Sequence, residues 1–224
     1  MTPDLAGAVV VVTGAGGRLG RVVVRRLLGA GARVAALDAR LPEELPDGVV
    51  AVGADLTDEG SVTEAFGEAE DAAGPVRGLV HTVGMWDGTP FAETSLESWR
   101  RMMDVNLTSL FLCFREAARR MASSSDAGRL VAIASGQGAD GGVAQQAAYS
   151  ASKAGAVRLV ESVAAEYDGR ITAVAVAPST ILFGGEGADA AGVSVEAVAD
   201  LCVYLCGPGG AVHNGTVLRA YGSA

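Results

Sequence analysis

Tyr149 and Lys153 stand four residues apart in the segment AAYSASKAG, residues 147–155. Residues at this spacing share one side of a helix, which would place the Lys153 ammonium beside the Tyr149 phenol. A neighbouring cation favours the phenolate and would bring the pKa of Tyr149 toward the range of a general acid or base. In the alternative interpretation, the two side chains only pack along one edge of a helix.

The scarcity of lysine favours the catalytic interpretation. Lys153 is the only lysine in a chain that carries sixteen arginines. Arginine serves equally well as a solvated surface charge, but it cannot provide a compact ammonium whose proton is tunable. We therefore expect a role at position 153 that arginine could not fill.

Length and composition restrict the class of protein. The chain has 224 residues, half of them apolar, and a net charge of −9, so we expect one α/β domain over residues 1–224. The negative charge argues against nucleic acid or an anionic membrane as a partner. Without a basic signal segment or a long apolar run, we expect a cytoplasmic protein. Cys113, Cys202 and Cys206 lack the spacing of a zinc site, so we interpret them as buried thiols and expect no metal.

Short β-branched runs alternate with longer helical patterns along the chain. This alternation is typical of βαβ units and predicts a doubly wound, mainly seven-stranded parallel sheet with helices on both faces. The expected strands are 8–13, 33–38, 49–55, 78–84, 129–135, 171–178 and 215–222. The expected helices lie near 18–30, 59–73, 95–121, 148–167 and 194–206.

A glycine-rich turn, TGAGGRLG at residues 13–20, joins the first strand to an amphipathic helix. Three glycines spaced by three residues permit a tight turn, and the helix N-terminus offers free N–H donors to a pyrophosphate. The position between strand and helix therefore predicts dinucleotide binding despite the negative charge of the protein. The residues expected at this turn are Gly14, Gly17, Arg18, Leu19 and Gly20.

Two acidic residues at strand ends are candidates for contacts with the adenosine half of the cofactor. Asp38 ends the second strand, where its carboxylate could accept hydrogen bonds from a ribose diol, which favours NAD over NADP. Alternatively, Asp38 caps the following turn, and Arg18 or Arg40 meets a 2′-phosphate. Asp55, with Leu56 beside it, could face the adenine amino group, or Asp55 could cap the next helix.

Four motifs in this order resemble the short-chain dehydrogenase/reductase family: TGAGGRLG at 13–20, NLT at 106–108, IAS ending at Ser135, and YSASK at 149–153. The resemblance spans about residues 5–222 and implies a Rossmann-type α/β fold. It also implies an NAD(P)-dependent ketoreductase that transfers hydride between the nicotinamide and a secondary alcohol or ketone. A small ketone, a 3-oxoacyl group and a polycyclic ketone all remain open as the small-molecule substrate.

The resemblance also implies a role for each catalytic candidate. Tyr149 would be the acid/base for the substrate oxygen, while Lys153 lowers the pKa of Tyr149 and reaches the nicotinamide ribose. Ser135 would hold the substrate oxygen, although a serine at a strand end can simply cap a turn. Asn106 would hold a water that completes a proton path through Lys153, unless it only bonds to nearby backbone.

The chain departs from the family pattern at two places that line the expected site. HTVG at 81–84 replaces the usual NNAG, so Gly84 keeps room beside the cofactor while we interpret His81 as a structural hydrogen-bonding residue. The glycine turn has Arg18 where the common branch has glycine. Met85 and Trp86 follow this strand and are candidates for a wall of the substrate pocket.

The larger departure follows Pro178, where PSTILF replaces the usual Pro-Gly. Pro178 and Ile181 are expected to contact the cofactor, but Phe183 stands where a threonine commonly meets the nicotinamide carboxamide. The substrate loop, at about 179–194, is short and rich in Gly and Ala, so we expect it to be mobile and the site to be open.

A homodimer or homotetramer is implied by the family, whose equivalent helices pair across an interface. The helices near 104–121 and 149–167 carry apolar residues on more than one side, which agrees with such pairing. These residues include Leu110, Phe111, Phe114, Val157, Val160 and Val163.

Two functions other than an oxidoreductase remain open at this stage. Phe183 and the short loop would suit a dinucleotide-binding sensor without turnover, although Tyr149 and Lys153 argue against it. A non-redox isomerase or lyase could use the same acid/base pair with no net change in NADH.

Overall fold

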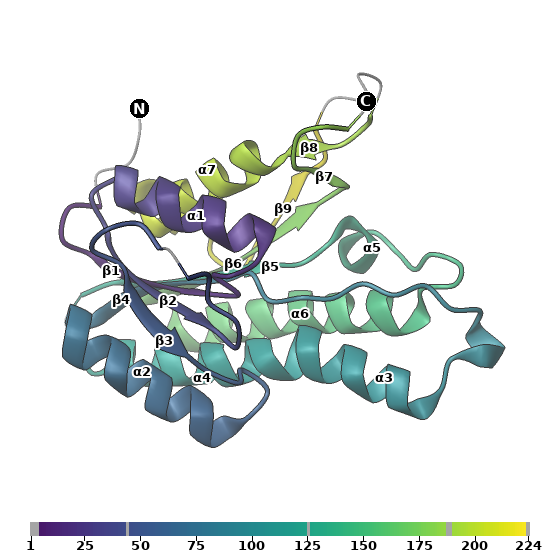
Figure 1. Cartoon of the computed structure of the whole chain (residues 1–224), viewed down its shortest axis with the longest axis horizontal. Coiled ribbons are helices and arrows are strands. Elements are labelled where there is room, and N and C mark those ends of the chain that lie inside the picture. Colours follow the sequence, from purple (N-terminus) through teal and green to yellow (C-terminus); the bar gives the residue numbers. More distant parts are fainter. Residues whose placement is uncertain (1–4, 44, 125, 187–189, 223–224) are drawn as a thin grey trace.

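The computed structural model describes residues 5–43, 45–124, 126–186 and 190–222. At its centre lies a sheet of seven parallel strands in the order β3-β2-β1-β4-β5-β6-β9 (Figure 1). The strands are β1 (Val9–Thr13), β2 (Arg33–Asp38), β3 (Val50–Gly53), β4 (Val76–His81), β5 (Gly128–Ile133), β6 (Ile171–Pro178) and β9 (Val217–Ala220). The predicted doubly wound parallel sheet is confirmed.

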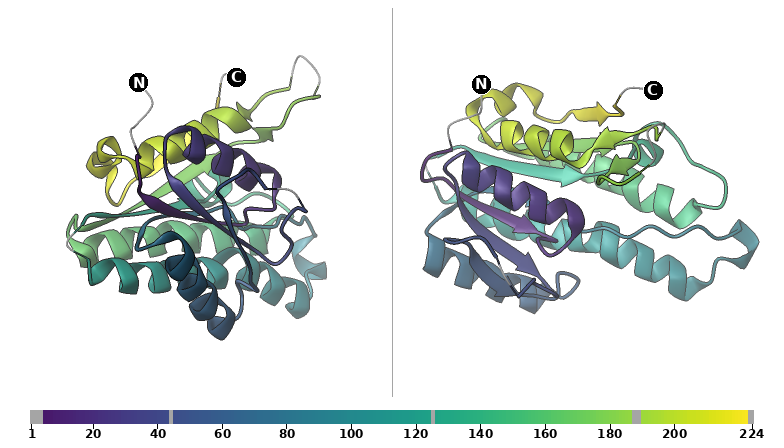
Figure 2. Two further views of the ribbon diagram at one scale, coloured as in Figure 1. Left: turned by 60° about the vertical axis from the view of Figure 1, so that its left-hand side comes forward. Right: turned by 45° about the horizontal axis from the view of Figure 1, so that its top comes forward.

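Helices cover both faces of this sheet, as Figures 1 and 2 show. One face carries α1 (Arg18–Gly29) and α7 (Val195–Cys206), and the other carries α2 (Glu59–Ala73), α4 (Ser109–Ala122) and α6 (Ala147–Tyr167). The remaining elements are η1 (Phe91–Glu93), α3 (Leu96–Met103), η2 (Asp104–Thr108), α5 (Gly136–Ala139), β7 (Ile181–Leu182), β8 (Val193–Ser194) and η3 (Pro208–His213). Among the described residues, no helix is both long and apolar enough to cross a membrane.

The two faces of the sheet are built by alternation along each strand. In β1, Val10 and Val12 pack under α1 and α7, whereas Val9 and Val11 pack against the helices of the opposite face. Successive side chains of a strand point to opposite faces, and both faces are covered. This is why the strands read as continuous apolar runs rather than as polar–apolar alternation.

Two differences from the expected element boundaries lie near the candidate site. β4 begins at Val76 and ends at His81, rather than spanning 78–84, so Thr82 through Gly84 belong to the loop that follows. The helix expected at 95–121 is interrupted by the π turn η2 between α3 and α4. Single π turns inside helices often occur at functional sites, and this one contains Asn106.

The substrate loop expected at 179–194 is closed at its base by a short pair of strands. Ile181 and Leu182 of β7 pair with Val193 and Ser194 of β8. Gly192 is required there because a Cβ at this position would lie 2.4 Å from the Thr180 carbonyl oxygen. Part of the loop that we predicted to be mobile, residues 187–189, lies outside the described residues.

Most residues that suggested an oligomer interface belong to the core of the chain itself, which corrects that interpretation. Leu110, Phe114, Val157 and Val160 are fully buried within the chain, so they cannot face a second copy. Phe111 is 42% exposed, and Val163 is partly buried. The correction concerns these residues, and the oligomeric state stays a prediction.

The three cysteines lie in apolar surroundings. Cys113 and Cys202 are fully buried, and Cys206 is partly buried. Burial raises the pKa of each thiol above its ordinary value, that of Cys206 to about 12. The prediction of buried thiols is confirmed for Cys113 and Cys202.

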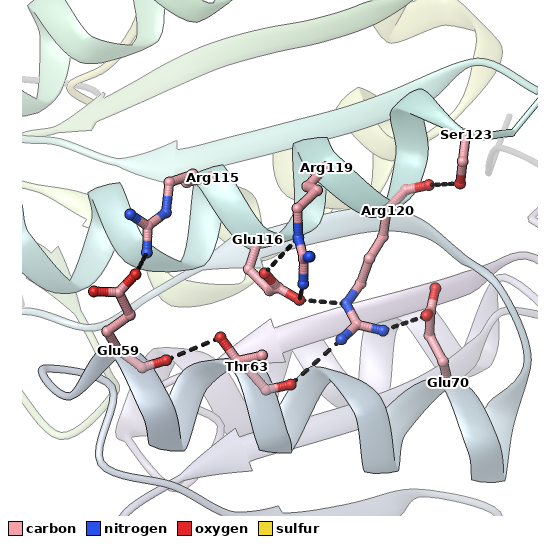
Figure 3. Close-up of polar contacts among 8 residues, drawn as sticks. All are labelled: Glu59, Thr63, Glu70, Arg115, Glu116, Arg119, Arg120 and Ser123. Atoms are coloured by element: carbon pink, nitrogen blue, oxygen red, sulfur yellow. Dashed lines mark hydrogen bonds and ion pairs between the residues drawn. The ribbon is translucent and has the colours of Figure 1, made fainter.

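A charged network joins α2 to α4 on one side of the sheet (Figure 3). The Arg120 guanidinium donates to Glu116 Oε1 at 2.7 Å and pairs with Glu70 of α2. Arg119 donates to both oxygens of Glu116, whose side chain is only 7% exposed. Burial alone would raise the pKa of Glu116, but the hydrogen bonds from Arg119 and Arg120 outweigh it and hold that pKa below its ordinary value.

Replacing Glu116 with Gln should lower the free energy of unfolding by about 1–3 kcal/mol at pH 7, because two guanidinium groups lose a buried carboxylate. Since the folded-state pKa of Glu116 is lowered, its contribution is present above about pH 4.3, the unfolded value, and is lost as the pH falls further. Urea denaturation of wild type and Glu116→Gln at pH 7 and pH 3 measures both effects.

Glu161→Gln is the matched control, because Glu161 pairs with Arg158 on the surface of one helix. An exposed pair of this kind contributes little, so the control should unfold at the wild-type urea concentration. Equal urea midpoints for Glu116→Gln and wild type at pH 7 would contradict a stabilising role for the network.

Candidate active site

A cavity of about 960 Å³ opens where the strands β4, β5 and β6 end. The carboxyl ends of parallel strands meet at one edge of a sheet, and ligands of such folds bind beyond this edge. The cavity brings together residues from distant parts of the chain that the sequence singled out. They are Leu19, Gly84, Ser135, Tyr149, Lys153, Pro178 and Ile181.

Ser135 and Tyr149 meet because the short helix α5 packs directly on α6. A Cβ at Gly138 would lie 2.4 Å from the backbone carbonyl carbon of Lys153, so only glycine allows this approach. Ser135 is buried and caps α5 by accepting a hydrogen bond from the Gln137 N–H at 3.3 Å. Ser135 therefore performs the structural role that we considered as an alternative, while its hydroxyl also faces Tyr149.

In the free protein the Tyr149 phenol is held in its protonated form. Burial raises the pKa of Tyr149 above its ordinary value, and a hydrogen bond with the Ser135 hydroxyl offsets part of that rise. Lys153 does not add to these two effects in the free protein, where its Nζ donates to the Ile133 carbonyl. A lowered Tyr149 pKa in the working enzyme stays a prediction.

Lys153 lies in the interior with its side chain directed at the end of β5. Its residue is 4% exposed, and Nζ donates to the Ile133 carbonyl oxygen at 2.9 Å. Gly84 leaves the space that the ammonium occupies, since a Cβ there would lie 3.1 Å from Nζ. Burial lowers the pKa of Lys153 to about 8, which brings its proton within reach of physiological pH.

Asn106 connects the loop after β4 to α6. Its Oδ1 accepts from the Met85 N–H at 2.7 Å, and its Nδ2 donates to the Met85 carbonyl at 3.0 Å. Nδ2 also donates to Ser152 Oγ at 3.0 Å, next to Lys153. These contacts show that the side chain fixes the position of the loop relative to α6. The water that Asn106 would hold in a proton path stays a prediction.

The glycine turn is tightly built and leaves a helix N-terminus facing the cavity edge. Gly14 has a φ of +73°, and a Cβ at Gly20 would lie 2.1 Å from the Gly14 carbonyl oxygen. Gly17 precedes α1, and no described residue caps this end with its side chain or places a carboxylate in its first turn. The unbonded N–H groups and the positive end of the helix dipole fit a pyrophosphate.

Asp38 lies beside this turn and is fixed by two backbone groups. Its Oδ1 accepts from the Arg40 N–H at 2.9 Å, and its Oδ2 accepts from the Gly16 N–H at 3.0 Å. The turn-capping alternative is thus realised in the free protein, and recognition of a ribose stays a prediction. Sequence reasoning missed Gly16, where a Cβ would lie 2.2 Å from the Arg40 carbonyl oxygen.

Asp55 does not cap α2, which corrects one of the two alternatives for this residue. The cap is Asp58, whose Oδ1 accepts from the Ser61 N–H at 2.7 Å. Asp55 Oδ1 instead accepts from the Thr57 hydroxyl and N–H, and these bonds lower the pKa of Asp55. The side chain of Leu56 is buried in the core, so only its backbone could meet a cofactor.

His81 is a structural residue, as its position in HTVG predicted. It is fully buried at the end of β4, with Nδ1 2.8 Å from the Thr13 hydroxyl and Nε2 3.3 Å from the Ser109 hydroxyl. Burial, together with the charge of Lys153, lowers the pKa of His81 to about 3. The neutral ring therefore links β1, β4 and α4 and is no second acid.

The outer wall of the cavity contains residues that sequence reasoning missed. Asp140, after α5, accepts hydrogen bonds from Arg219 Nε at 2.7 Å and from the Tyr221 hydroxyl. Asp140 and Tyr221 line the cavity, as does Gln137. Tyr221 directly follows the edge strand β9, and this position at a strand end was the available signal.

The candidates Met85 and Trp86 both line the cavity. Trp86 is 61% exposed and donates from its indole Nε1 to Gln146 Oε1 at 3.1 Å. This contact joins the loop after β4 to the residue before α6. The exposure of Trp86 agrees with the expected open site.

Comparisons with known proteins agree with this geometry. Residues 8–185 match the family described as short chain dehydrogenase. A short-chain type dehydrogenase/reductase of Picea abies is 33% identical and covers 97% of this chain and 92% of its own. The 2-dehydro-3-deoxy-L-rhamnonate dehydrogenase (NAD(+)) of a Sphingomonas strain is 34% identical over 78% of this chain and 72% of that protein. A short chain dehydrogenase from Mycobacterium smegmatis superimposes with a TM-score of 0.88 at 28% identity, over 99% of this chain and 94% of that one.

Replacing Lys153 with Met should stabilise the free protein at pH 7 by about 2 kcal/mol. The pKa of Lys153 is about 8 in the folded protein and roughly 10.4 in the unfolded chain, so the buried ammonium destabilises the fold by about 3 kcal/mol at pH 7. The Met variant recovers this free energy but loses the hydrogen bond to Ile133, which leaves the smaller net gain. Because the unfolded chain binds the extra proton between these pH values, wild-type stability rises from pH 8 to 10.4. Urea denaturation across this pH range should show the free energies of unfolding of wild type and Lys153→Met converging.

Arg158→Met, at an exposed position of the same helix, controls for the loss of a charge and should change stability little. A Lys153→Met variant that is less stable than wild type at pH 7, or a gap that stays constant up to pH 10.4, would exclude an unfavourable buried ammonium.

Proposed function

We propose a reaction for this chain from one premise: it belongs to the short-chain dehydrogenase/reductase family and is an oxidoreductase. The proposed reaction is hydride transfer between the nicotinamide of NAD and a secondary alcohol or ketone. The observation that carries the proposal is the meeting of Ser135, Tyr149 and Lys153 at one cavity beside the glycine turn.

The protein contributes the proton and the orientation of the substrate. NAD, when bound, supplies the group that accepts or donates hydride. We propose that Tyr149 gives its proton to the ketone oxygen in reduction and takes it back in alcohol oxidation. The raised pKa of Tyr149 in the free protein keeps the phenol protonated at neutral pH, the form that reduction requires. Ser135 would donate a hydrogen bond to the same substrate oxygen.

Lys153 and Asn106 would act through Tyr149 and the loop rather than on the substrate. The buried ammonium of Lys153 stands one helical turn from Tyr149 and can favour the phenolate once the bond to Ile133 is exchanged for cofactor hydroxyls. Asn106, by holding Met85 and Ser152, would keep this part of the site in place. We also propose that protons pass from Tyr149 through Lys153 toward solvent.

NAD is the preferred cofactor in this proposal. The Asp38 carboxylate is fixed at the end of β2 beside the glycine turn, where it would repel the 2′-phosphate of NADP and accept bonds from a ribose diol. The Sphingomonas relative carries NAD(+) in its name.

A homodimer or homotetramer remains our proposal for the assembly. Its support is a group of exposed apolar side chains on neighbouring elements, since exposed apolar patches often mark interfaces. The group comprises Phe91, Leu96, Trp99 and Phe111 on η1, α3 and α4.

We expect NADH to bind at least about tenfold more tightly than NADPH, because one like-charge contact of about 1.4 kcal/mol has that effect. Titration of the purified protein with each nucleotide, followed by protein fluorescence, measures both dissociation constants. Asp38→Asn should reduce the ratio of the NADPH dissociation constant to the NADH dissociation constant. Tighter binding of NADPH by the wild type would overturn the assignment of NAD.

Tyr149→Phe should lower kcat/KM by about 10²–10⁴-fold, because the proton donor is lost while cofactor contacts remain. The assay follows NADH at 340 nm with a panel of ketones and, in reverse, alcohols. Because oxidation needs the phenolate and reduction needs the phenol, wild-type alcohol oxidation should increase as the pH rises toward the Tyr149 pKa of the cofactor-bound enzyme, whereas ketone reduction should decline.

The outcomes also separate the two alternative functions. NADH binding with no oxidation or reduction in any assay would favour a dinucleotide sensor. Conversion of a substrate in a Tyr149-dependent way, without net change in NADH, would favour an isomerase or lyase. Equal activity of Tyr149→Phe and wild type would exclude Tyr149 as the acid/base.

A further inference from the structure

The two departures from the family pattern nearest the cofactor site are in contact with each other. The guanidinium carbon of Arg18 lies 3.8 Å from the centroid of the Phe183 ring. Arg18 is the first residue of α1, directly after the glycine turn, whereas Phe183 follows β7 in the loop after β6. Phe183 and Leu19, the residue after Arg18, both line the cavity, so the contact lies at the cavity edge.

We propose that Arg18 and Phe183 form a clasp that holds the pyrophosphate of the bound dinucleotide. In this clasp the Arg18 guanidinium provides the positive charge, and the face of the Phe183 ring holds the guanidinium in place. The inference rests on the proposed binding of NAD and assigns to Phe183 a positioning role.

The pyrophosphate needs a counter-charge that the rest of the site supplies only in part. The protein carries a net charge of −9, and the end of a helix contributes only about half a positive charge. Lys153 is buried against Ile133 at the end of β5, and Arg21 donates its Nε to the Gly16 carbonyl. Arg18 is the cation whose side chain starts at the unbonded N–H groups of α1.

The backbone of Phe183 is held by the strand pair before it and by a hydrogen bond from its own N–H. Residues 181–182 of β7 pair with β8 immediately before it, and the Phe183 N–H donates to Glu186 Oε1 at 3.0 Å. The hydrogen bond from Phe183 lowers the pKa of Glu186, and the nearby charge of Arg18 lowers it further. The ring, the guanidinium and the carboxylate therefore form one local arrangement across the cavity edge.

The arrangement explains why both departures occur in one chain. An arginine at position 18 has a long, flexible side chain, and fixing it on an aromatic face reduces the ordering that binding would otherwise require. A phenylalanine at position 183 removes a hydroxyl from the loop, but it provides the face on which the guanidinium rests. The charge of Arg18 thus replaces the polar contact that a threonine at position 183 would provide.

The test is calorimetric titration of the full chain with NADH and with ADP-ribose, which shares the pyrophosphate but lacks nicotinamide. The variants are Arg18→Ala, Phe183→Leu and the double variant, each at three salt concentrations. Arg18→Ala should raise Kd for both ligands by about tenfold or more and flatten the dependence of Kd on salt, because a charge contact is lost. Phe183→Leu should raise Kd by about two- to fivefold.

The two residues should also be coupled. Without Arg18 the ring has nothing to position, so the double variant should bind as Arg18→Ala does rather than more weakly. Arg25→Ala removes an exposed charge from the same helix and should leave Kd unchanged. Arg18→Lys keeps the charge with poorer stacking, so its Kd should fall between those of wild type and Arg18→Ala.

Unchanged Kd and salt dependence in Arg18→Ala would overturn the clasp, as would additive effects of the two substitutions. Either result could occur while the wild type binds NADH normally, so the proposed function would stand. Failure of the wild type to bind NADH, NADPH and ADP-ribose would instead overturn the proposed function and the clasp with it.

Discussion

The burial of one ammonium group is the constraint on which the rest of the site depends. An unpaired buried charge destabilises a fold by several kcal/mol, and the Lys153 ammonium is satisfied here by the Ile133 carbonyl at 2.9 Å. That bond requires α6 to lie across the end of β5, and it leaves little room at position 84, where a Cβ would lie 3.1 Å from Nζ. The core residues Val157 and Val160 hold α6 on the sheet, and this position brings Tyr149 and Lys153 to the same cavity.

The surroundings of Lys153 show how the fold meets this requirement. The glycine at position 138 lets α5 approach α6 closely enough to bring Ser135 to Tyr149. The π turn η2 contains Asn106, whose side chain holds the loop after β4. Two glycines and one widened helical turn thus allow the close packing around Tyr149 and Lys153. This is the local irregularity expected where function competes with regular packing.

The sequence predicted the regular elements well, because the spacing of apolar residues shows which side chains of each helix or strand are buried. β1, β2 and β6 were found within one residue, since fully apolar runs have clear limits. The cap of α2 was harder because Asp55 and Asp58 both precede it, and only the exact helix start at Glu59 selects Asp58. The oligomer argument failed for Leu110 and Phe114 because α4 packs on both the sheet and α2. An apolar second side on a helix does not reveal whether its partner belongs to the same chain.

Contacts between distant positions could not be predicted either, because the sequence does not show which elements pack against each other. Arg18 and Phe183 were noted as separate departures from the family pattern, and no contact between them was expected. Their separation in the chain hides that the glycine turn and the loop after β6 lie at the same edge of the sheet. An acidic protein that binds a dinucleotide has to concentrate positive charge locally, because a diffuse positive field is absent. A guanidinium held on an aromatic ring meets that need without adding another buried cation, which the site already has in Lys153.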